Sequence, residues 1–194
     1  MPKDALQRYR LVPNDTALLL VDFQEKLAAA MPPADRQICE KNIILLLDLA
    51  ARQRWPVVVS EQYPHGLGAT VPALQSALQA HADAVHKLEK LHFATTDAPE
   101  FAATFAHIQR RRWVVVGMEA HVCVFQTVRG LLDLGAYVFV PEDAVLSRAP
   151  SNRHRGLTLM SDMGATITSS EVVVFDALQI AGTPDFKALS KQLR

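Results

Sequence analysis

The chain has 194 residues, of which 49% are hydrophobic and 21% are charged. Its 20 basic and 20 acidic residues give a formal net charge of zero, which excludes the strongly basic surface typical of nucleic-acid-binding proteins. The apolar runs are shorter than the roughly 20 residues that a membrane-spanning helix needs, and the polar N-terminus lacks the apolar stretch of a secretory signal. We therefore expect a cytoplasmic protein with no nucleic-acid or membrane partner.

Five short apolar segments predict strands, and most of them are rich in β-branched residues. In chain order they are residues 16–23, 56–63, 113–120, 136–144 and 165–175. Because these runs lack a regular polar alternation, they fit strands that are buried on both faces, as in a parallel sheet. The arginines that precede the third run, at positions 110–112, could form a small local basic patch, but they are interpreted as a solvated helix end.

Amphipathic segments between these runs predict helices over residues 34–54, 70–82, 123–135 and 151–164. The last two end on glycine, a common residue just past a helix terminus. Alternating strands and helices predict an α/β layered fold with a mostly parallel sheet, formed by residues 1–194 as a single domain.

Ligands of such sheets bind beyond the carboxyl ends of the strands, so polar residues at those positions are candidates for a site. Asp22 and Cys123 follow apolar runs, and Lys90 lies in a connecting segment between two strand-bearing regions. Each residue also has an ordinary interpretation: a helix cap for Asp22, a solvated side chain for Lys90 and a buried thiol for Cys123. Cys39, the second cysteine, lies in a helical pattern and is interpreted as a packing residue.

Together these three residues suit nucleophilic chemistry. A thiol with a pKa near ~8.5 is only slightly ionised at neutral pH, so it needs a base or a nearby positive charge. Asp22 can act as the base, and we expect Lys90 and a helix N-terminus to stabilise the thiolate of Cys123. Backbone N–H groups at the same helix start can hold an oxyanion.

Five segments carry a resemblance to a known family: LLLVDFQEKL, SEQYPHGLGATVPAL, EKLHFAT, GMEAHVCVFQT and EDAVLSRAP. In this order and spacing, they resemble the isochorismatase-like cysteine hydrolase superfamily, over roughly residues 14–178. The similarity is greatest to the branch of short proteins named only for the isochorismatase domain. It implies a three-layer α/β/α sandwich of the Rossmann-like type.

The resemblance also implies roles for individual residues. Asp22, Lys90 and Cys123 match the catalytic triad of the superfamily, and Lys90 is preferred to Lys87 because an aromatic residue follows it at the third position. A non-proline cis peptide bond is implied between Met118 and Glu119. The backbone N–H groups of Glu119 and Cys123 would then form an oxyanion hole.

The sequence departs from two better-known branches of the superfamily. Nicotinamidases carry an aspartate and histidines after the second strand and bind a divalent metal, whereas only Glu61 and His65 occupy that region here. A metal site usually needs three or more protein ligands, so we predict no metal and no other cofactor. True isochorismatases typically lack the nucleophilic cysteine, so Cys123 argues against that activity.

Aromatic residues flank the triad in sequence and suggest an apolar pocket for a small uncharged substrate, although several of them could simply pack in the core. His121 is ranked below Asp22 as the base, because residues two positions apart on a turn usually point in different directions. The candidate substrate-binding residues are Phe23, Tyr63, Phe93, His121 and Phe125.

The expected function is metal-independent hydrolysis of a small amide or ester, with a non-peptide C–N bond favoured, through a thioester on Cys123. The alternative is a catalytically weak or silent family member that acts as a binding or scaffold protein. By analogy with the superfamily we also expect a homo-oligomer, consistent with apolar tail residues such as Leu178, Ile180 and Phe186.

Overall fold

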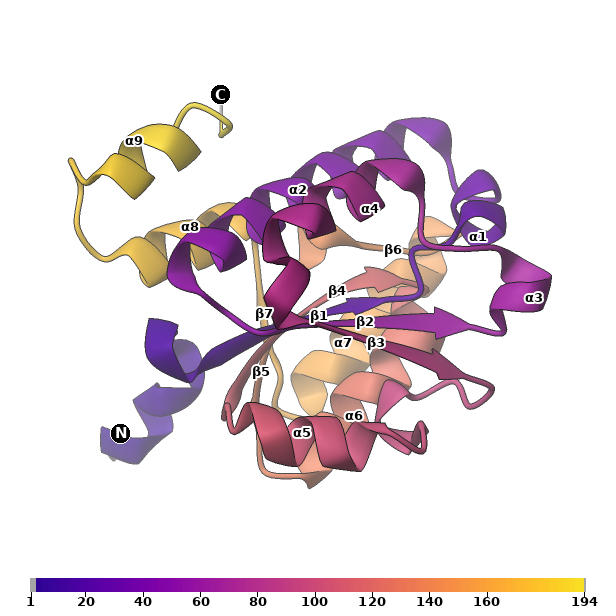
Figure 1. Ribbon diagram of the computed structural model, residues 1–194. Coiled ribbons are helices and arrows are strands. Elements are labelled where there is room, and N and C mark those ends of the chain that lie inside the picture. Colours follow the sequence, from indigo (N-terminus) through magenta and orange to yellow (C-terminus); the bar gives the residue numbers. More distant parts are fainter. Residues whose placement is uncertain (1–2, 194) are drawn as a thin grey trace.

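The computed structural model describes residues 3–193 and has three layers, with a central sheet between two layers of helices (Figure 1). Seven strands form one sheet in the order β3-β2-β1-β4-β5-β7, and β6 pairs with the end of β4. All pairings between these strands are parallel. The prediction of a three-layer α/β/α sandwich with a mostly parallel sheet is confirmed.

The strands are β1 (Thr16–Val21), β2 (Val57–Gln62), β3 (Val85–Lys90), β4 (Arg112–Met118), β5 (Tyr137–Pro141), β6 (Val145–Leu146) and β7 (Thr166–Thr168). The helices are α1 (Glu25–Ala29), α2 (Pro33–Gln53), α3 (Pro64–Leu67), α4 (Pro72–Leu78), α5 (Phe101–Ile108), α6 (Phe125–Asp133), α7 (Pro150–Asp162), α8 (Ser170–Leu178) and α9 (Pro184–Leu189). Two short turns matter for the site: the 3-10 turn η4 (Thr95–Asp97) and the π-helical turn η5 (Ala120–Val124).

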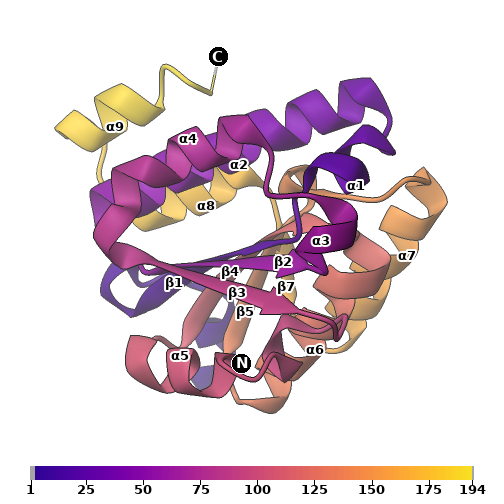
Figure 2. The same cartoon turned by 45° about the vertical axis from the view of Figure 1, so that its right-hand side comes forward.

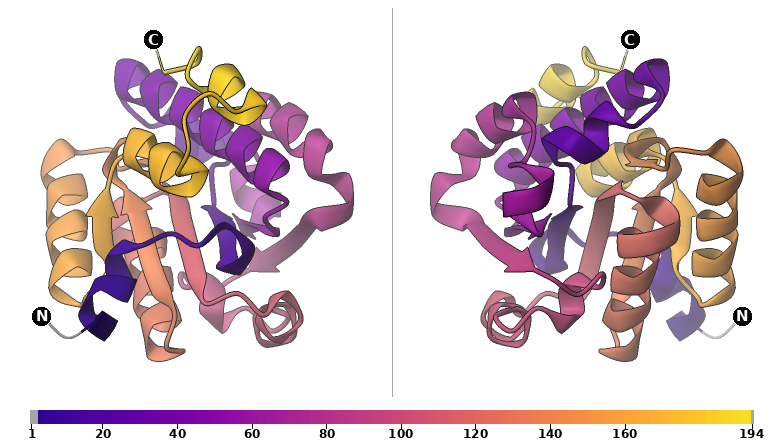
Figure 3. Two further views of the ribbon diagram at one scale, coloured as in Figure 1. Left: turned by 90° about the vertical axis from the view of Figure 1, so that its left-hand side faces the viewer. Right: turned by 90° about the vertical axis from the view of Figure 1, so that its right-hand side faces the viewer.

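Helices cover both faces of the sheet and bury two apolar clusters against it. Helices α2, α4 and α8 lie on one face, and α5, α6 and α7 lie on the other (Figure 2). The short C-terminal helix α9 packs against α2 and α8, outside the sheet layer (Figure 3). All six residues of β1 are buried, because this strand lies between β2 and β4 and is covered on both faces.

The predicted strand over residues 165–175 is wrong for most of its length. Only its first part pairs with β5, as β7, and α8 begins two residues later. Ser169 caps this helix, because its side chain accepts the N–H of Val172. Val173 and Val174 are buried against α2, so tertiary packing overrides the β propensity of the valine run.

Strand β3 was not predicted, and it changes the position of Lys90 from a connecting segment to the end of a strand. Leu88 and Lys90 are buried, whereas Lys87 and Glu89 are exposed. This alternation is typical of an edge strand with one solvated face, and it differs from the uniformly apolar runs that predict the inner strands.

The interpretation of the arginines at positions 110–112 as a solvated helix end is wrong for Arg112. This residue begins β4 and is only 2% exposed. Its guanidinium forms an ion pair with Asp15 and donates to the carbonyl of Arg10 (2.8 Å) and to Gln7 Oε1 (3.0 Å). These acceptors offset the free-energy cost of burying the charged guanidinium.

The apolar tail residues have different environments. Leu178 packs against the core, and the Phe186 ring lies 6.1 Å from the ring of Phe175. Ile180 is 68% exposed. Self-association therefore stays a prediction. Within residues 3–193, no helix combines the length and apolarity needed to cross a membrane.

Gly117 allows the ends of β1 and β4 to lie close together. Its φ is +116°, in the region that favours glycine, and a Cβ atom there would lie 2.0 Å from the carbonyl oxygen of Val21. Since Asp22 follows Val21 directly, Gly117 fixes the spacing between the segments that carry Asp22 and Cys123.

We expect Gly117→Ala to lower the free energy of unfolding by more than about 2 kcal/mol, because it adds a backbone clash to an unfavourable φ. Gly135→Ala is the matched control. Its φ is +79°, but a Cβ there meets no heavy atom within 4 Å, so only about 1 kcal/mol should be lost. Urea denaturation of both variants checks the difference, and equal losses would contradict the close approach.

Candidate active site

Three chain segments end at one edge of the sheet and bring Asp22, Lys90 and Cys123 together. Asp22 directly follows β1, Lys90 ends β3, and Cys123 lies in η5, just after β4. Because all these strands are parallel, their carboxyl ends meet at the same edge, which we call the carboxyl edge. The Lys90 Nζ atom lies 2.5 Å from Asp22 Oδ2, although β2 separates the two strands in the sheet.

Asp22 is completely buried and has a φ of +48°, a left-handed conformation that aspartate tolerates better than most residues. Its Oδ2 atom accepts from Lys90, and its Oδ1 atom accepts from the Ser60 hydroxyl at 2.7 Å. Burial raises the pKa of Asp22 above its ordinary value, although the charge of Lys90 and hydrogen bonds from Lys90, Ser60 and Cys123 oppose the shift.

The Lys90 ammonium group uses all three of its N–H donors inside the protein. Besides Asp22, it donates to Gln62 Oε1 at 2.8 Å and to the carbonyl oxygen of Phe93 at 3.0 Å. Its side chain is fully buried. Lys90 therefore holds the carboxylate in place and has no free donor to offer to another molecule.

Cys123 lies in a π-helical turn that continues into α6, so it sits within the first turn of a longer helical segment. The residue is 6% exposed. Burial, the charge of Asp22, a hydrogen bond with that carboxyl and the charge of Glu119 raise the pKa of the Cys123 thiol to about 12, although the charge of Lys90 opposes them. Lys90 therefore favours the thiolate, as expected, but burial and the neighbouring carboxylates outweigh its effect on the thiol pKa.

The loop before Cys123 is tied to a neighbouring segment through Glu119. The peptide bond between Met118 and Glu119 is cis, at the position that the resemblance implies. The Glu119 carboxylate is buried, lies 3.1 Å from the Arg148 guanidinium and accepts the backbone N–H of Arg148 at 3.1 Å. Arg148, which sequence reasoning missed, thus fixes the segment after β6 against the loop that leads to the thiol.

The predicted substrate-binding residues do not form one cluster. Phe23 is completely buried and packs in the core on the α2 face, so it serves packing. Tyr63 and Phe93 are 52% and 54% exposed and follow β2 and β3 at the carboxyl edge.

His121 and Phe125 lie on the helical segment that carries Cys123. The His121 Nδ1 atom is 3.0 Å from the hydroxyl oxygen of Ser147, which orients the imidazole toward β6. Phe125 is half-buried, and the Arg129 guanidinium lies over its ring at 5.5 Å from the centroid. Neither contact involves the carboxylate of Asp22.

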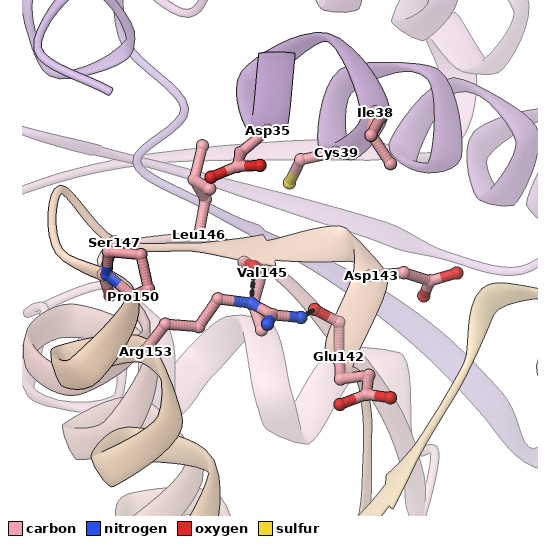
Figure 4. Close-up of a pocket in the computed structure, with 10 residues that line it drawn as sticks. All are labelled: Asp35, Ile38, Cys39, Glu142, Asp143, Val145, Leu146, Ser147, Pro150 and Arg153. Atoms are coloured by element: carbon pink, nitrogen blue, oxygen red, sulfur yellow. Dashed lines mark hydrogen bonds between the residues drawn. The ribbon is translucent and has the colours of Figure 1, made fainter. Parts of the chain in front are cut away.

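Two cavities flank the carboxyl edge. One, of about 430 Å³, is lined by Lys90, Tyr63, His92 and their neighbours. The other, of about 380 Å³, lies between α2, β6 and α7, and Figure 4 shows the Cys39 thiol on its wall and the Arg153 side chain across it.

The Arg153 guanidinium donates to the carbonyl oxygens of Val145 (3.0 Å) and Glu142, so it braces the chain around β6 (Figure 4). Burial raises the pKa of the Cys39 thiol. This cysteine is 2% exposed and packs in the core on the α2 face, which agrees with its interpretation as a packing residue.

In the part of the chain that the structure describes, no three His, Cys, Asp or Glu side chains are grouped so that they could hold a metal ion. Glu61 accepts from the N–H and hydroxyl of Thr70, both at 2.7 Å, so it secures a loop. His65 is exposed in α3, on the wall of the larger cavity. The donor set around β2 therefore does not fit a divalent metal.

Sequence reasoning missed the polar residues that surround the ion pair. Ser60 and Gln62 lie in β2 and contact Asp22 and Lys90, respectively. Thr95 and Thr127 are buried behind them. The polar end of the second apolar run was a usable signal for Ser60, but no sequence pattern links the two threonines to the site.

The fold and the carboxyl edge define an α/β/α protein of the Rossmann-like class, with a polar cluster at the strand ends. Residues 16–172 match the isochorismatase domain family. This match covers most of the chain, and the chain belongs to the isochorismatase family.

Individual relatives cover nearly the whole chain. It is 35% identical over 187 residues to the "Secreted isochorismatase effector Isc1" of Phytophthora sojae, covering 95% of this chain and 87% of that protein. It is 32% identical over 185 residues to "Isochorismatase domain-containing protein 2" of Bos taurus, covering 95% and 86%. Among solved structures, the "MAR1 Ribonuclease from Caenorhabditis elegans" matches with a TM-score of 0.85 and 34% identity, covering 95% of this chain and 92% of that chain.

We expect Asp22→Asn to lower the pKa of the Cys123 thiol, because it removes a negative charge that raises this pKa and leaves the charge of Lys90, which lowers it. In a Cys39→Ala background, iodoacetamide should alkylate Cys123 roughly tenfold faster at pH 8 than in the parent, for each unit by which the pKa falls.

Asp133→Asn is the matched control, because Asp133 is exposed at the far end of α6 and should leave the alkylation rate unchanged. A thermal melt verifies that the Asp22 variant is folded at the assay temperature. An alkylation rate that stays the same or falls in Asp22→Asn would contradict the inferred coupling between the carboxylate and the thiol.

Proposed function

We propose that this chain is a cysteine hydrolase that cleaves a small amide or ester through a thioester on Cys123. The observation that carries the proposal is the buried ion pair of Lys90 and Asp22 beside this thiol, at the carboxyl edge of the sheet. A buried carboxylate next to a neutral thiol is suited to take its proton during attack.

In the first half of the reaction, the Cys123 sulfur attacks the substrate carbonyl carbon, and its proton passes to Asp22. The negative charge on the carbonyl oxygen is held by the backbone N–H groups of Glu119 and Cys123. When the C–N or C–O bond breaks, the leaving amine or alcohol takes the proton from Asp22. The acyl group remains on sulfur as a thioester.

In the second half, water attacks the thioester carbon and gives a proton to Asp22. The C–S bond then breaks, and the sulfur takes the proton back. The products are a carboxylic acid and an amine or alcohol, so one water is consumed. Lys90 contributes by holding Asp22 in position through a 2.5 Å contact, since its donors are all engaged within the protein.

The burial of the site favours a small-molecule substrate. Asp22 is completely buried and Cys123 is 6% exposed, so the thiol offers little surface for contact with a large substrate. The similar protein from Caenorhabditis elegans is named a ribonuclease. RNA is a polyanion, however, and the net charge of zero of this chain does not favour binding it. We therefore propose that the chain hydrolyses a non-peptide C–N bond of a small molecule, and we favour this reaction over cleavage of RNA.

We expect Cys123→Ala to reduce kcat/KM by at least about a thousandfold on any amide or ester that the wild type hydrolyses, because the nucleophile is removed. The measurement is a screen of small amides, ureides and esters, with intact-protein mass spectrometry to detect the acyl adduct. Cys39→Ala is the control and should keep activity and adduct.

Full activity of Cys123→Ala on a confirmed substrate would refute the thioester route. RNA cleavage that survives in this variant would assign a different reaction. A wild type without turnover or adduct on any probe would favour the binding or scaffold alternative.

The pH dependence follows from Asp22. The base must be deprotonated, and its pKa is raised, so kcat/KM should fall with decreasing pH at a higher pH than an aspartate with the ordinary value of 3.8 would impose. Because the thiol pKa is about 12, thiol ionisation should add no rise between pH 7 and pH 10. A profile that rises tenfold per pH unit through this range would instead assign the reaction to a free thiolate.

A further inference from the structure

A chain of three buried hydroxyl groups runs from α6 to the Asp22 carboxylate. The Ser60 hydroxyl donates to Asp22 Oδ1 at 2.7 Å, and the Thr95 hydroxyl donates to Ser60 Oγ at 3.1 Å. The Thr127 hydroxyl donates to Thr95 Oγ1 at 3.3 Å. Ser60, Thr95 and Thr127, which we call the hydroxyl chain, are each 0% exposed.

The hydrogen bonds of the hydroxyl chain all point in one direction, toward Asp22. An ionised carboxylate can only accept, so the Ser60 proton must point to Asp22, and the Ser60 oxygen must then accept from Thr95. By the same reasoning, the Thr95 oxygen accepts from Thr127. The backbone N–H of Thr95 donates to Thr127 Oγ1 at 2.8 Å, which holds the far end in place. Hydrogen bonds aligned in this way polarise one another, most effectively where water is excluded.

The far end of the hydroxyl chain lies on the segment that carries the nucleophile. Thr127 follows Cys123 by four residues, about one helical turn, so both side chains lie on the same side of that segment. Close packing keeps α6 against η4: a Cβ atom on Gly130 would lie 2.1 Å from Thr96 Oγ1. The hydroxyl chain therefore joins the helix of the thiol to the carboxylate that faces the thiol.

We infer that Ser60, Thr95 and Thr127 are positioning residues, which orient the Asp22 carboxylate and fix it relative to the helical segment of Cys123. Ser60 contacts the Asp22 carboxylate but neither the thiol nor the substrate, and Thr95 and Thr127 act on Asp22 only through Ser60. This inference rests on the proposed role of Asp22 as the base, but the arrangement of the hydroxyl chain has a consequence that is measurable without any substrate.

That consequence is the protonation of Asp22. The titratable or charged groups that influence Asp22 directly are Lys90 from β3 and Cys123 from η5, and Glu119 acts on Cys123 from the loop before it. The hydrogen bond from Ser60 lowers the pKa of Asp22, against the larger effect of burial. If the hydroxyl chain polarises Ser60, removing the hydroxyl of Thr95 should weaken that bond and make Asp22 easier to protonate.

The test is a pH titration by NMR of protein labelled with ¹³C at the aspartate carboxyl carbons, with the Asp22 signal assigned by its loss in Asp22→Asn. We expect Ser60→Ala to raise the Asp22 midpoint by about one pH unit, because a hydrogen bond to the charged form is lost. Thr95→Val, which is isosteric, should raise it by a smaller but measurable amount. Thr95→Ser should titrate like the wild type.

Thr96→Val is the matched control, because it makes the same change one residue along, outside the hydroxyl chain, and should leave the midpoint unchanged. If Thr95→Val does not fold, Thr95→Ala removes the same hydroxyl without branching at Cβ. With an identified substrate, Thr95→Val should lower kcat with little change in KM and move the acid limb of the pH profile upward, and Thr95→Ser should reverse both effects.

A wild-type midpoint in Thr95→Val would overturn the inference, because Ser60 would then act alone. Equal shifts in Thr95→Val and Thr96→Val would also overturn it, since they would indicate a general loss of packing. A wild type that shows no hydrolysis, yet shifts its Asp22 midpoint in Thr95→Val and not in Thr96→Val, would keep the hydroxyl chain and reject the proposed function.

Discussion

The ion pair between Lys90 and Asp22 is the constraint on which the carboxyl edge depends. Both side chains are fully buried, and two charges in such a place are stable only with close geometry and with every remaining donor satisfied. The pairing of β3 with β2 supplies that geometry, because it sets Lys90 opposite Gln62, whose amide oxygen accepts one ammonium proton. Removal of either charge would leave the other buried and uncompensated, at a cost of about 3–5 kcal/mol.

The same ion pair affects the Asp22 carboxylate and the Cys123 thiol differently. Lys90 is fixed by three acceptors, so its charge acts on Asp22 first and on Cys123 only at a distance. Asp22 therefore keeps a partner for its negative charge, while the neighbouring thiol stays neutral under the combined effect of burial and that charge. Burial raises the pKa of both groups, but only Asp22 has a buried ammonium group in direct contact that opposes the shift.

Sequence reasoning succeeded where a residue type and its position carried the signal. Uniform valine and leucine runs predicted the inner strands, and their ends indicated Asp22 and Cys123. It failed where the outcome depended on partners far along the chain. The valines of α8 are helical because Ser169 caps them and α2 covers them, and Arg112 is buried because Asp15, Gln7 and Arg10 gather around it. Thr95 and Thr127 have no local pattern at all, since only folding brings them to Ser60.

The raised pKa and the burial of Cys123 also bear on how readily its sulfur is oxidised. Peroxides react with thiolates, and the first product, a sulfenic acid, forms fastest at exposed cysteines of low pKa. Cys123 has the opposite properties, because it is nearly buried and its pKa is raised to about 12. The environment that disfavours ionisation of the thiol thus also disfavours oxidation of its sulfur.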